Sequence, residues 1–336
     1  MASPNLSEIV TTTLRNRSGK LADSVTRNNA LLDRLRSKGK KKPFSGGRTI
    51  VQEIEYAMNS TYKRYSGYEA LNIQPSDVFT AAEFPIRQAA VAVSISGLEE
   101  LQNAGKERVI DLLESRISNA ERTFQNGIAY DVYSNGTLPG QITGLQALVP
   151  ASQNTGVVGG IDRSVWAFWN NAYRSSSANS VTLSATTVQS EFANIGLKLV
   201  RGMDKPDLIV CDQNIYNYYL QSLVALQRID SDGNSKGVGG GFPSLKYFGL
   251  GRSIDVVLDG GFQGFSTDYI PVGGAPSSTA YFLNTDYIYY RPHSDRDMVP
   301  LNPDRFSVNQ DAMVKLIAWA GNMTISNSFL QGVLTS

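Results

Sequence analysis

Apolar residues recur at helical spacing most regularly in the segment after Gly105. Six of them lie three or four positions apart, with charged residues on the other faces: Val109, Leu113, Ile117, Ala120, Phe124 and Ile128. A stripe of this kind is typical of a helix that packs one face against a core. The pattern predicts one helix from Lys106 to Tyr133, roughly 42 Å long at about 1.5 Å per residue.

Strand-like alternation lies on both sides of that helix in the sequence. Phe84–Ile95 alternates, and the segments Ala312–Ala320 and Asn322–Phe329, separated by Gly321, alternate in a similar way. A period of two is typical of strands that bury one face. We expect the C-terminal strands to pair with Phe84–Ile95, so that the domain around the long helix is discontinuous in sequence.

The segment from Arg48 to Asn72 is rich in β-branched and aromatic residues. Its two runs, Thr49–Ala57 and Thr61–Leu71, are joined across the polar pair Asn59-Ser60 and predict a hairpin with arms about 30 Å long. An isolated hairpin is marginally stable in water, so it must lie either on a partner subunit or on the chain's own body. The candidate contact residues are aromatic and charged: Glu53, Glu55, Tyr56, Tyr62, Lys63, Arg64, Tyr65 and Tyr68.

From about residue 136 to residue 302, short helices alternate with short strands, which is typical of an α/β domain. Predicted helices begin at Asp162, where Trp166, Trp169 and Tyr173 share one face, and at Ser184. A third helix follows the short buried strand Asp207–Cys211. The remaining predicted strands are Ile254–Leu258 and a hairpin of Ala280–Leu283 with Tyr287–Tyr290.

Composition excludes several classes of enzyme. Among 336 residues, 41% are hydrophobic and 18% charged, and there is one cysteine, Cys211, and one histidine, His293. An intramolecular disulfide and a zinc site made of cysteine and histidine alone are excluded, and a catalytic triad would depend on a single imidazole. The polar residues after His293 and at Asp230–Asn234 are better explained as a loop and a turn. We predict no catalytic residue, no metal and no cofactor.

The chain shows no sign of membrane insertion or export. No stretch approaches the roughly 18 apolar residues of a membrane span. The segment Met1–Val10 lacks the apolar run of a secretory signal. We expect the protein to be made and kept in a cytoplasm, with no membrane partner.

The first fifty residues are strongly basic. They contain eleven Lys and Arg against three Asp and Glu, a net charge of +8, so the remainder carries −7 within the overall +1. A basic arm on a mildly acidic body indicates contact with nucleic acid or with an acidic protein surface. We place subunit or scaffold contact first and non-specific DNA contact second. The residues expected to face these partners are Arg15, Arg17, Lys20, Arg27, Arg34, Arg36, Lys40, Lys41 and Lys42.

The order of these elements resembles the major capsid proteins of tailed bacteriophages, which have the Hong Kong 97-like fold. Four short sequences are similar to phage coat sequences: Lys42–Gly47, Tyr65–Glu69, Asp207–Asp212 and Phe248–Gly251. The resemblance covers essentially the whole chain, and its specificity lies in the order of elements, because no single motif is diagnostic. It implies an α+β fold with an N-terminal arm (residues 1–47), an extended β-hairpin loop (48–75), a peripheral domain with a long spine helix (76–135), an inserted axial α/β domain (136–302) and terminal strands of the peripheral domain (303–336).

The resemblance also implies a function and partners. The chain would be a shell protein, not an enzyme, that assembles as hexamers and pentamers into an icosahedral virion capsid around double-stranded DNA, within the bacterial host cytoplasm. A separate scaffolding protein is implied because the arm is too short to be a fused scaffold. A portal protein and a decoration protein are further implied partners. Two alternatives remain: an encapsulin-like compartment enclosing protein cargo, and a cytoplasmic carbohydrate-active enzyme with a cleft in residues 136–302.

Overall fold

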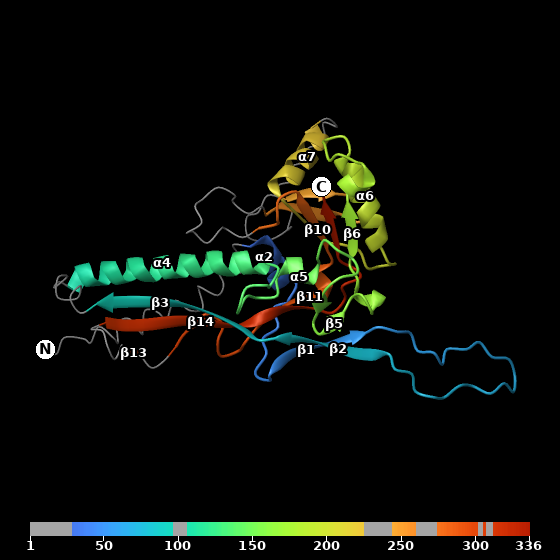
Figure 1. The fold of residues 1–336 in the computed structure, drawn as a ribbon, viewed down its shortest axis with the longest axis horizontal. Helices are drawn as coiled ribbons and strands as arrows, with labels where there is room; N and C mark the ends of the chain where they lie inside the picture. Colours follow the sequence, from blue (N-terminus) through green and yellow to red (C-terminus); the bar gives the residue numbers. More distant parts are fainter. Residues whose placement is uncertain (1–28, 97–105, 225–243, 260–273, 302–304, 307–311) are drawn as a thin grey trace.

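The long helix predicted after Gly105 is present as α4 (Lys106–Val132) in the computed structural model, which describes residues 29–96, 106–224, 244–259, 274–301, 305–306 and 312–336. Figure 1 shows α4 lying along a thin sheet, with a taller α/β body at its C-terminal end. From Ile117 onward, where burial is described, the predicted stripe is the buried face, since Ile117, Phe124 and Ile128 are buried. The helix ends against Gly144, where a Cβ atom would lie 2.4 Å from the Asp131 carbonyl oxygen. Only glycine fits this close approach.

The thin sheet is built around β14 (Ala312–Ile325). One edge of β14 pairs antiparallel with β3 (Arg87–Ser96), in a register from Ala312 opposite Ser96 to Gly321 opposite Arg87. The predicted pairing of the C-terminal strands with Phe84–Ile95 is therefore confirmed for β14. The other edge of β14 pairs with three shorter strands: β11 (Ile288–Pro292), β12 (Val299–Pro300) and β13 (Arg305–Phe306).

The prediction that Gly321 separates two strands is wrong, because β14 continues through this residue. Glycine is required there, since a Cβ atom would lie 2.5 Å from the Arg291 carbonyl oxygen and 2.7 Å from the Trp319 ring. Glycine in a strand interior often marks such a close approach.

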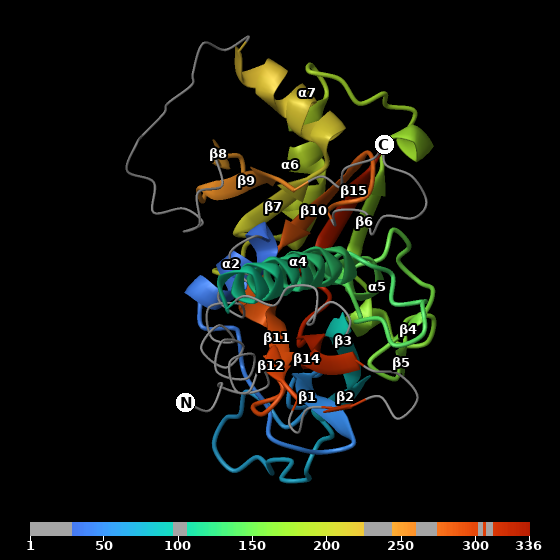
Figure 2. The ribbon, with the colours of Figure 1, turned by 90° about the vertical axis from the view of Figure 1, so that its left-hand side faces the viewer.

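The taller body contains a six-stranded sheet in the order β6-β15-β10-β7-β9-β8. Figure 2 shows this sheet beside α6 and α7. Its central strand β7 is buried at every position, as the short apolar run Asp207–Cys211 predicted. The bounds of its elements are β6 (Ala172–Ser175), β7 (Leu208–Cys211), β8 (Ser244–Tyr247), β9 (Ile254–Leu258), β10 (Thr279–Leu283), β15 (Gly332–Thr335), α6 (Val188–Leu199) and α7 (Gln213–Val224). Three short elements lie between α4 and β6 in the sequence: α5 (Leu145–Leu148), β4 (Val157–Val158) and β5 (Ile161–Asp162).

Three predictions for this region are wrong. The last strand, β15, pairs with β10 and β6 and so belongs to the taller body, not to the sheet of β3. The expected hairpin around Asn284-Thr285-Asp286 does not form, because β10 and β11 lie in different sheets on either side of a short 3-10 turn, Thr285–Tyr287.

The third wrong prediction is the helix after Asp162. Residues Ala167–Trp169 form one 3-10 turn, and β6 begins at Ala172. The buried guanidinium of Arg163 donates hydrogen bonds to the Leu148 carbonyl at 2.6 Å and to the Ser328 hydroxyl at 3.1 Å. These partners are distant in sequence, so the helical spacing of the aromatic residues could not reveal them.

The predicted hairpin exists with a different second strand. β1 (Thr49–Glu55) pairs with β2 (Phe79–Pro85), from Thr49 opposite Pro85 to Glu55 opposite Phe79, so the paired stretch extends beyond the predicted end at residue 75. Thr61–Leu71 forms no strand. The buried face of the pair explains the register, because Ile54 and Phe84 point into the core.

Candidate functional site

The most exposed apolar side chains of the described chain are concentrated in the segment between β1 and β2, residues 56–78, which we call the projecting loop. Figure 1 shows this loop extending away from both bodies. Tyr62 is 81% exposed and Tyr68 is fully exposed. The other exposed apolar residues of the loop are Met58, Tyr65, Leu71 and Ile73. A gathering of this kind on a soluble protein typically marks an interaction site.

The predicted contact residues occupy two different environments. Tyr62, Lys63, Arg64, Tyr65 and Tyr68 lie in the projecting loop and are exposed, and the Lys63 ammonium is 2.9 Å from a carboxylate oxygen of Glu69. The residues at the base of the loop differ: Glu53 and Glu55 lie on the exposed face of β1, whereas Tyr56 is partly buried.

Tyr56 fixes the base of the loop to the body. Its ring stacks on Phe168 with 5.3 Å between ring centroids and lies 6.4 Å from the Trp166 ring. A pocket of about 340 Å³ adjoins this aromatic cluster and is also lined by Arg201 and Phe329. The loop is therefore anchored by aromatic packing at its base and uncovered beyond it.

The described part of the basic arm, residues 29–44, packs onto its own chain, and we call it the basic strap. It begins with Asn29, whose side chain caps α2 (Ala30–Ser37) by accepting hydrogen bonds from the Leu31 and Leu32 amides. The apolar face of α2, including Leu31 and Leu35, is fully buried. The strap then runs beside β11, where the Lys42 amide donates to the Tyr290 carbonyl at 3.0 Å.

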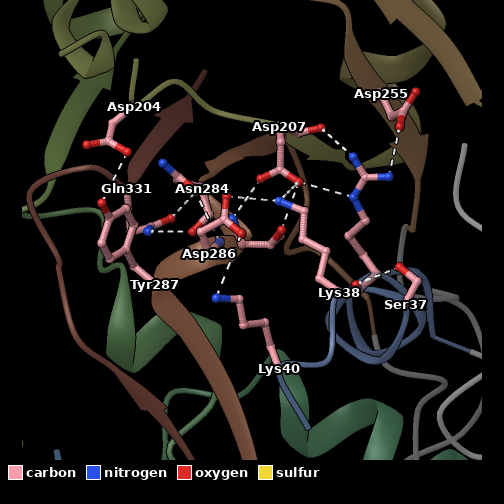
Figure 3. Close-up of polar contacts among 12 residues, drawn as sticks. Ser37, Lys38, Lys40, Asp204, Asp207, Asp255, Asn284, Asp286, Tyr287 and Gln331 are labelled. Atoms are coloured by element: carbon pink, nitrogen blue, oxygen red, sulfur yellow. Dashed lines mark hydrogen bonds and ion pairs between the residues drawn. The ribbon is translucent and has the colours of Figure 1, made fainter. Parts of the chain in front are cut away.

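Asp207 is the centre of the polar contacts made by the strap (Figure 3). Its side chain is fully buried, and its Oδ2 atom is 3.1 Å from Arg34 Nε and 2.9 Å from Lys38 Nζ. The backbone amide of Thr285 donates to Asp207 Oδ1 at 2.7 Å, and the Thr285 hydroxyl donates to Oδ2 at 2.8 Å. Burial alone would raise the pKa of Asp207, but the Lys38 charge and the hydrogen bonds from Thr285 and Lys38 hold it below its ordinary value.

Further acidic groups surround the same cations. Arg34 also contacts Asp255, with 3.2 Å between the guanidinium and the carboxylate, and Lys38 contacts Asp286 at 3.1 Å. Figure 3 shows these carboxylates coming from β9 and from the turn before β11. The strap therefore contacts both β9 of the six-stranded sheet and the turn Thr285–Tyr287.

The remaining cations of the strap also meet groups of the same chain. Lys40 is 3.8 Å from Asp286, and Lys41 is 2.6 Å from Asp297. The Lys42 ammonium lies 5.0 Å from the centroid of the Tyr289 ring. Of the predicted basic residues, Arg34, Lys40, Lys41 and Lys42 thus have partners within the chain, and Arg36 is partly buried on α2. Arg15, Arg17, Lys20 and Arg27 lie outside the described residues.

No sequence pattern singles out the acidic partners of the strap. Asp207 is the start of a predicted buried strand and of one of the phage-like sequences, but neither feature indicates an ion pair, and Asp255 and Asp286 carry no pattern of their own. A carboxylate next to a fully apolar strand is a weak signal for a buried cation partner, because buried charges are normally paired. That signal existed at Asp207, but it did not indicate which cation would pair.

A second buried carboxyl, Asp259, links the strap to the end of α4. The Tyr133 hydroxyl donates to Asp259 Oδ2 at 2.5 Å, and the Ala30 backbone donates to the same carboxyl group. The residue as a whole is partly exposed, but its carboxyl group lies in the interior. Burial raises the pKa of Asp259 to about 6, although both hydrogen bonds lower it.

This carboxyl should make the subunit less stable as the pH rises from about 4 to about 6. Because the pKa of Asp259 in the folded state lies above its value in the unfolded chain, the folded state binds more protons across that range. We expect Asp259→Asn to raise the free energy of unfolding by about 1–3 kcal/mol at pH 7.5 and to leave it nearly unchanged at pH 4. Urea denaturation of the unassembled subunit at both pH values measures this, and an equal loss of stability at both would contradict it.

The described residues contain no cluster of three His, Cys, Asp or Glu side chains arranged to hold a metal ion. His293 packs edge-on against Phe44, with 5.0 Å between ring centroids, and its Nδ1 accepts from the Asp295 amide. Cys211 is buried, and burial raises the pKa of its thiol. Among the helices described, none is long and apolar enough to cross a membrane.

A search of solved structures found chains similar to this one over nearly its whole length. A chain of the cyanophage A-1(L) capsid asymmetric unit is 15% identical, with a TM-score of 0.56 over 88% of this chain and 90% of that one. A chain of the capsid of a native GTA particle is 12% identical, with a TM-score of 0.50 over 90% and 89%. A chain of Mycobacterium phage Bobi is 10% identical, with a TM-score of 0.51 over 91% and 90%. No protein-family model and no curated protein matches the sequence.

At these identities the likeness concerns the fold. The chain has the α+β fold of phage capsid proteins, and both the predicted fold class and the predicted resemblance to Hong Kong 97-like capsid proteins are confirmed. Because a fold alone does not define a function, the function has to be argued from the exposed surfaces of this chain.

Proposed function

We propose that this protein is a major capsid protein that assembles into the icosahedral shell of a tailed phage around its double-stranded DNA. The observation that carries the proposal is the projecting loop. It is an exposed apolar segment on a chain whose fold is similar to that of solved capsid chains. Apart from its base at Tyr56, this loop has no core of its own and buries little on its own chain. A neighbouring copy would cover the exposed side chains and give the loop a fixed position.

Each part of the fold has a role in this proposal. The peripheral domain, with α4 on the sheet of β3 and β14, provides a stiff plate. The six-stranded body acts as the axial domain and gathers copies around rotation axes, and it includes β15 at the C-terminal end. The projecting loop clasps a neighbour. Many weak contacts per subunit then give a stable shell through multivalency.

Partners other than the chain itself belong to the same proposal. The cations of the basic strap are engaged within the subunit, so contact with a scaffolding protein, a neighbouring subunit or packaged DNA falls to the first 28 residues. These carry Arg15, Arg17, Lys20 and Arg27. A portal protein would occupy one vertex, and a decoration protein would bind the outside. The virion capsid is the proposed location, and no catalytic activity is part of the proposal.

Assembly of the purified protein tests the function. The protein is concentrated alone and with a scaffolding protein, separated by size-exclusion chromatography and viewed by negative-stain electron microscopy. We expect closed shells or rings of five and six copies. A small oligomer of fixed size under every condition would contradict the proposal. Shells that enclose protein cargo instead of DNA would replace it with an encapsulin-like compartment.

A further inference from the structure

β3 presents the longest strand edge that no described strand pairs. It has ten residues, and in the part of the chain that the structure describes its only strand partner is β14 on one side. Natural proteins usually protect such an edge by shortening the strand or by placing lysine or proline in it. β6 and β8 have four residues each, and β12 contains Pro300. β3 contains no lysine, proline or glycine.

The two faces of β3 differ in what covers them. α4 covers one face of β3, where Val93 and Ile95 are buried (Figure 2). On the opposite face the exposed side chains include Ala90 and Ala92, which are small. The Ser94 carbonyl accepts a hydrogen bond from the Arg116 guanidinium, so the stretch that a further strand could use is residues 87–93.

The projecting loop contains a segment that has the composition of a strand but no strand partner within the described residues. Residues 61–66, with the sequence Thr-Tyr-Lys-Arg-Tyr-Ser, have the β-branched and aromatic composition typical of strands but form no strand in the subunit. The segment ends at Gly67, whose φ of +61° turns the chain. Six residues would span about 20 Å at roughly 3.3 Å per residue, which suits the seven residues of β3 that remain.

We propose that residues 61–66 of one copy add as a further strand to the edge of β3 in a second copy. The inference rests on the proposed shell function and deepens it by naming the partner surface of the projecting loop. Backbone hydrogen bonds would supply affinity, and alternate side chains would supply specificity. Tyr62 and Arg64 would point to one side of the extended sheet, and Lys63 and Tyr65 to the other.

Cysteine cross-linking in assembled shells tests the alternation. Ala92→Cys is combined in turn with Tyr62→Cys, Lys63→Cys, Arg64→Cys or Tyr65→Cys. The native Cys211 is buried and does not interfere. Cβ atoms of directly opposed residues on paired strands lie about 4.5–5.5 Å apart, close to the separation that a disulfide needs. We expect intersubunit disulfides at alternate positions, 62 and 64 or 63 and 65. Equal cross-linking at all four positions, or none, would overturn the pairing.

Proline substitution tests the backbone hydrogen bonds. In a strand the amides of adjacent residues point to opposite edges, so Lys63→Pro and Arg64→Pro are made in turn, and one of them removes an amide donor that faces β3. Because the segment forms no strand in the subunit, both unassembled variants should melt at the temperature of the wild type. We expect at least one of them to raise the critical concentration for shell assembly roughly tenfold or more. Ala70→Pro, in the same loop beyond Gly67, is the matched control and should assemble nearly as the wild type does. Assembly of both variants at the concentration of the control would overturn the inference.

The same experiments separate this inference from the proposed function. If the wild type forms shells and the cysteine pairs do not cross-link alternately, the pairing is wrong and the shell function stands. If no shells form under any condition, the function itself fails. The single variant Ala92→Cys gives one more result. If it forms disulfide-linked dimers in shells, the edge of β3 pairs with β3 of a second copy, and the proposal that the loop pairs there is overturned.

Discussion

Asp207→Asn is expected to lower the free energy of unfolding of the subunit by about 3–5 kcal/mol, the range typical of removing one partner from a buried ion pair. The substitution removes the buried carboxylate that faces both Arg34 and Lys38, and it leaves these cations with weaker partners. The amide oxygen can still accept one of the two hydrogen bonds from Thr285, but the NH2 group cannot accept the other, so the expected loss combines the missing charge with one lost hydrogen bond. Urea denaturation of the unassembled subunit at pH 7 measures it.

Asp286→Asn is the matched control for this prediction. Asp286 also contacts Lys38, but its side chain is 48% exposed, and pairs that reach solvent typically contribute less than about 1 kcal/mol. Because the pKa of Asp207 is lowered in the folded state, its contribution is present above the pKa of the unfolded chain and disappears as the pH falls through the folded value. The difference between the two variants should therefore shrink in acid. Equal losses at pH 7 would show that burial of Asp207 is unimportant.

Replacing Tyr62, Tyr65 and Tyr68 together by serine is expected to abolish shell assembly without destabilising the subunit. All three rings are exposed in the isolated chain, so their removal takes away little packing. Tyrosine is enriched among the interface residues whose truncation costs 2 kcal/mol or more, and three such losses, about 6 kcal/mol together, would raise the critical concentration about ten-thousandfold. Light scattering during assembly and the melting temperature of the subunit give the two required measurements.

The corresponding phenylalanine variant provides the control. It keeps the apolar rings and loses only the hydroxyl groups, so most of the assembly should remain. Shells formed by the serine variant at wild-type concentrations would contradict the role of the loop. A lowered melting temperature of the serine variant would show instead that the loop contributes to the fold of its own chain.

The basic strap, which is the described part of the arm, shows how a sequence prediction can be correct in its charge and wrong in its partner. The sequence indicated an acidic protein surface as a partner of the arm, and the strap does meet acidic groups. These groups lie in the same subunit, however, and the pair of Arg34 with Asp207 spans 173 residues. Charge patterning indicates what kind of partner a segment needs, but it contains no information about distance along the chain.

The sequence by itself determined the elements whose signal is local. α4, α6, β7 and β9 follow from apolar periodicity or from short buried runs, because each of these residues is placed by its neighbours along the chain. The tertiary structure decided the pairings: β2 instead of Thr61–Leu71 as the partner of β1, β15 in the six-stranded sheet, and the strap on Asp207. Apolar alternation indicates which face of a strand is buried but is nearly the same for every strand of similar length. The choice of partner therefore depends on three-dimensional packing and on charges that meet only in the folded chain.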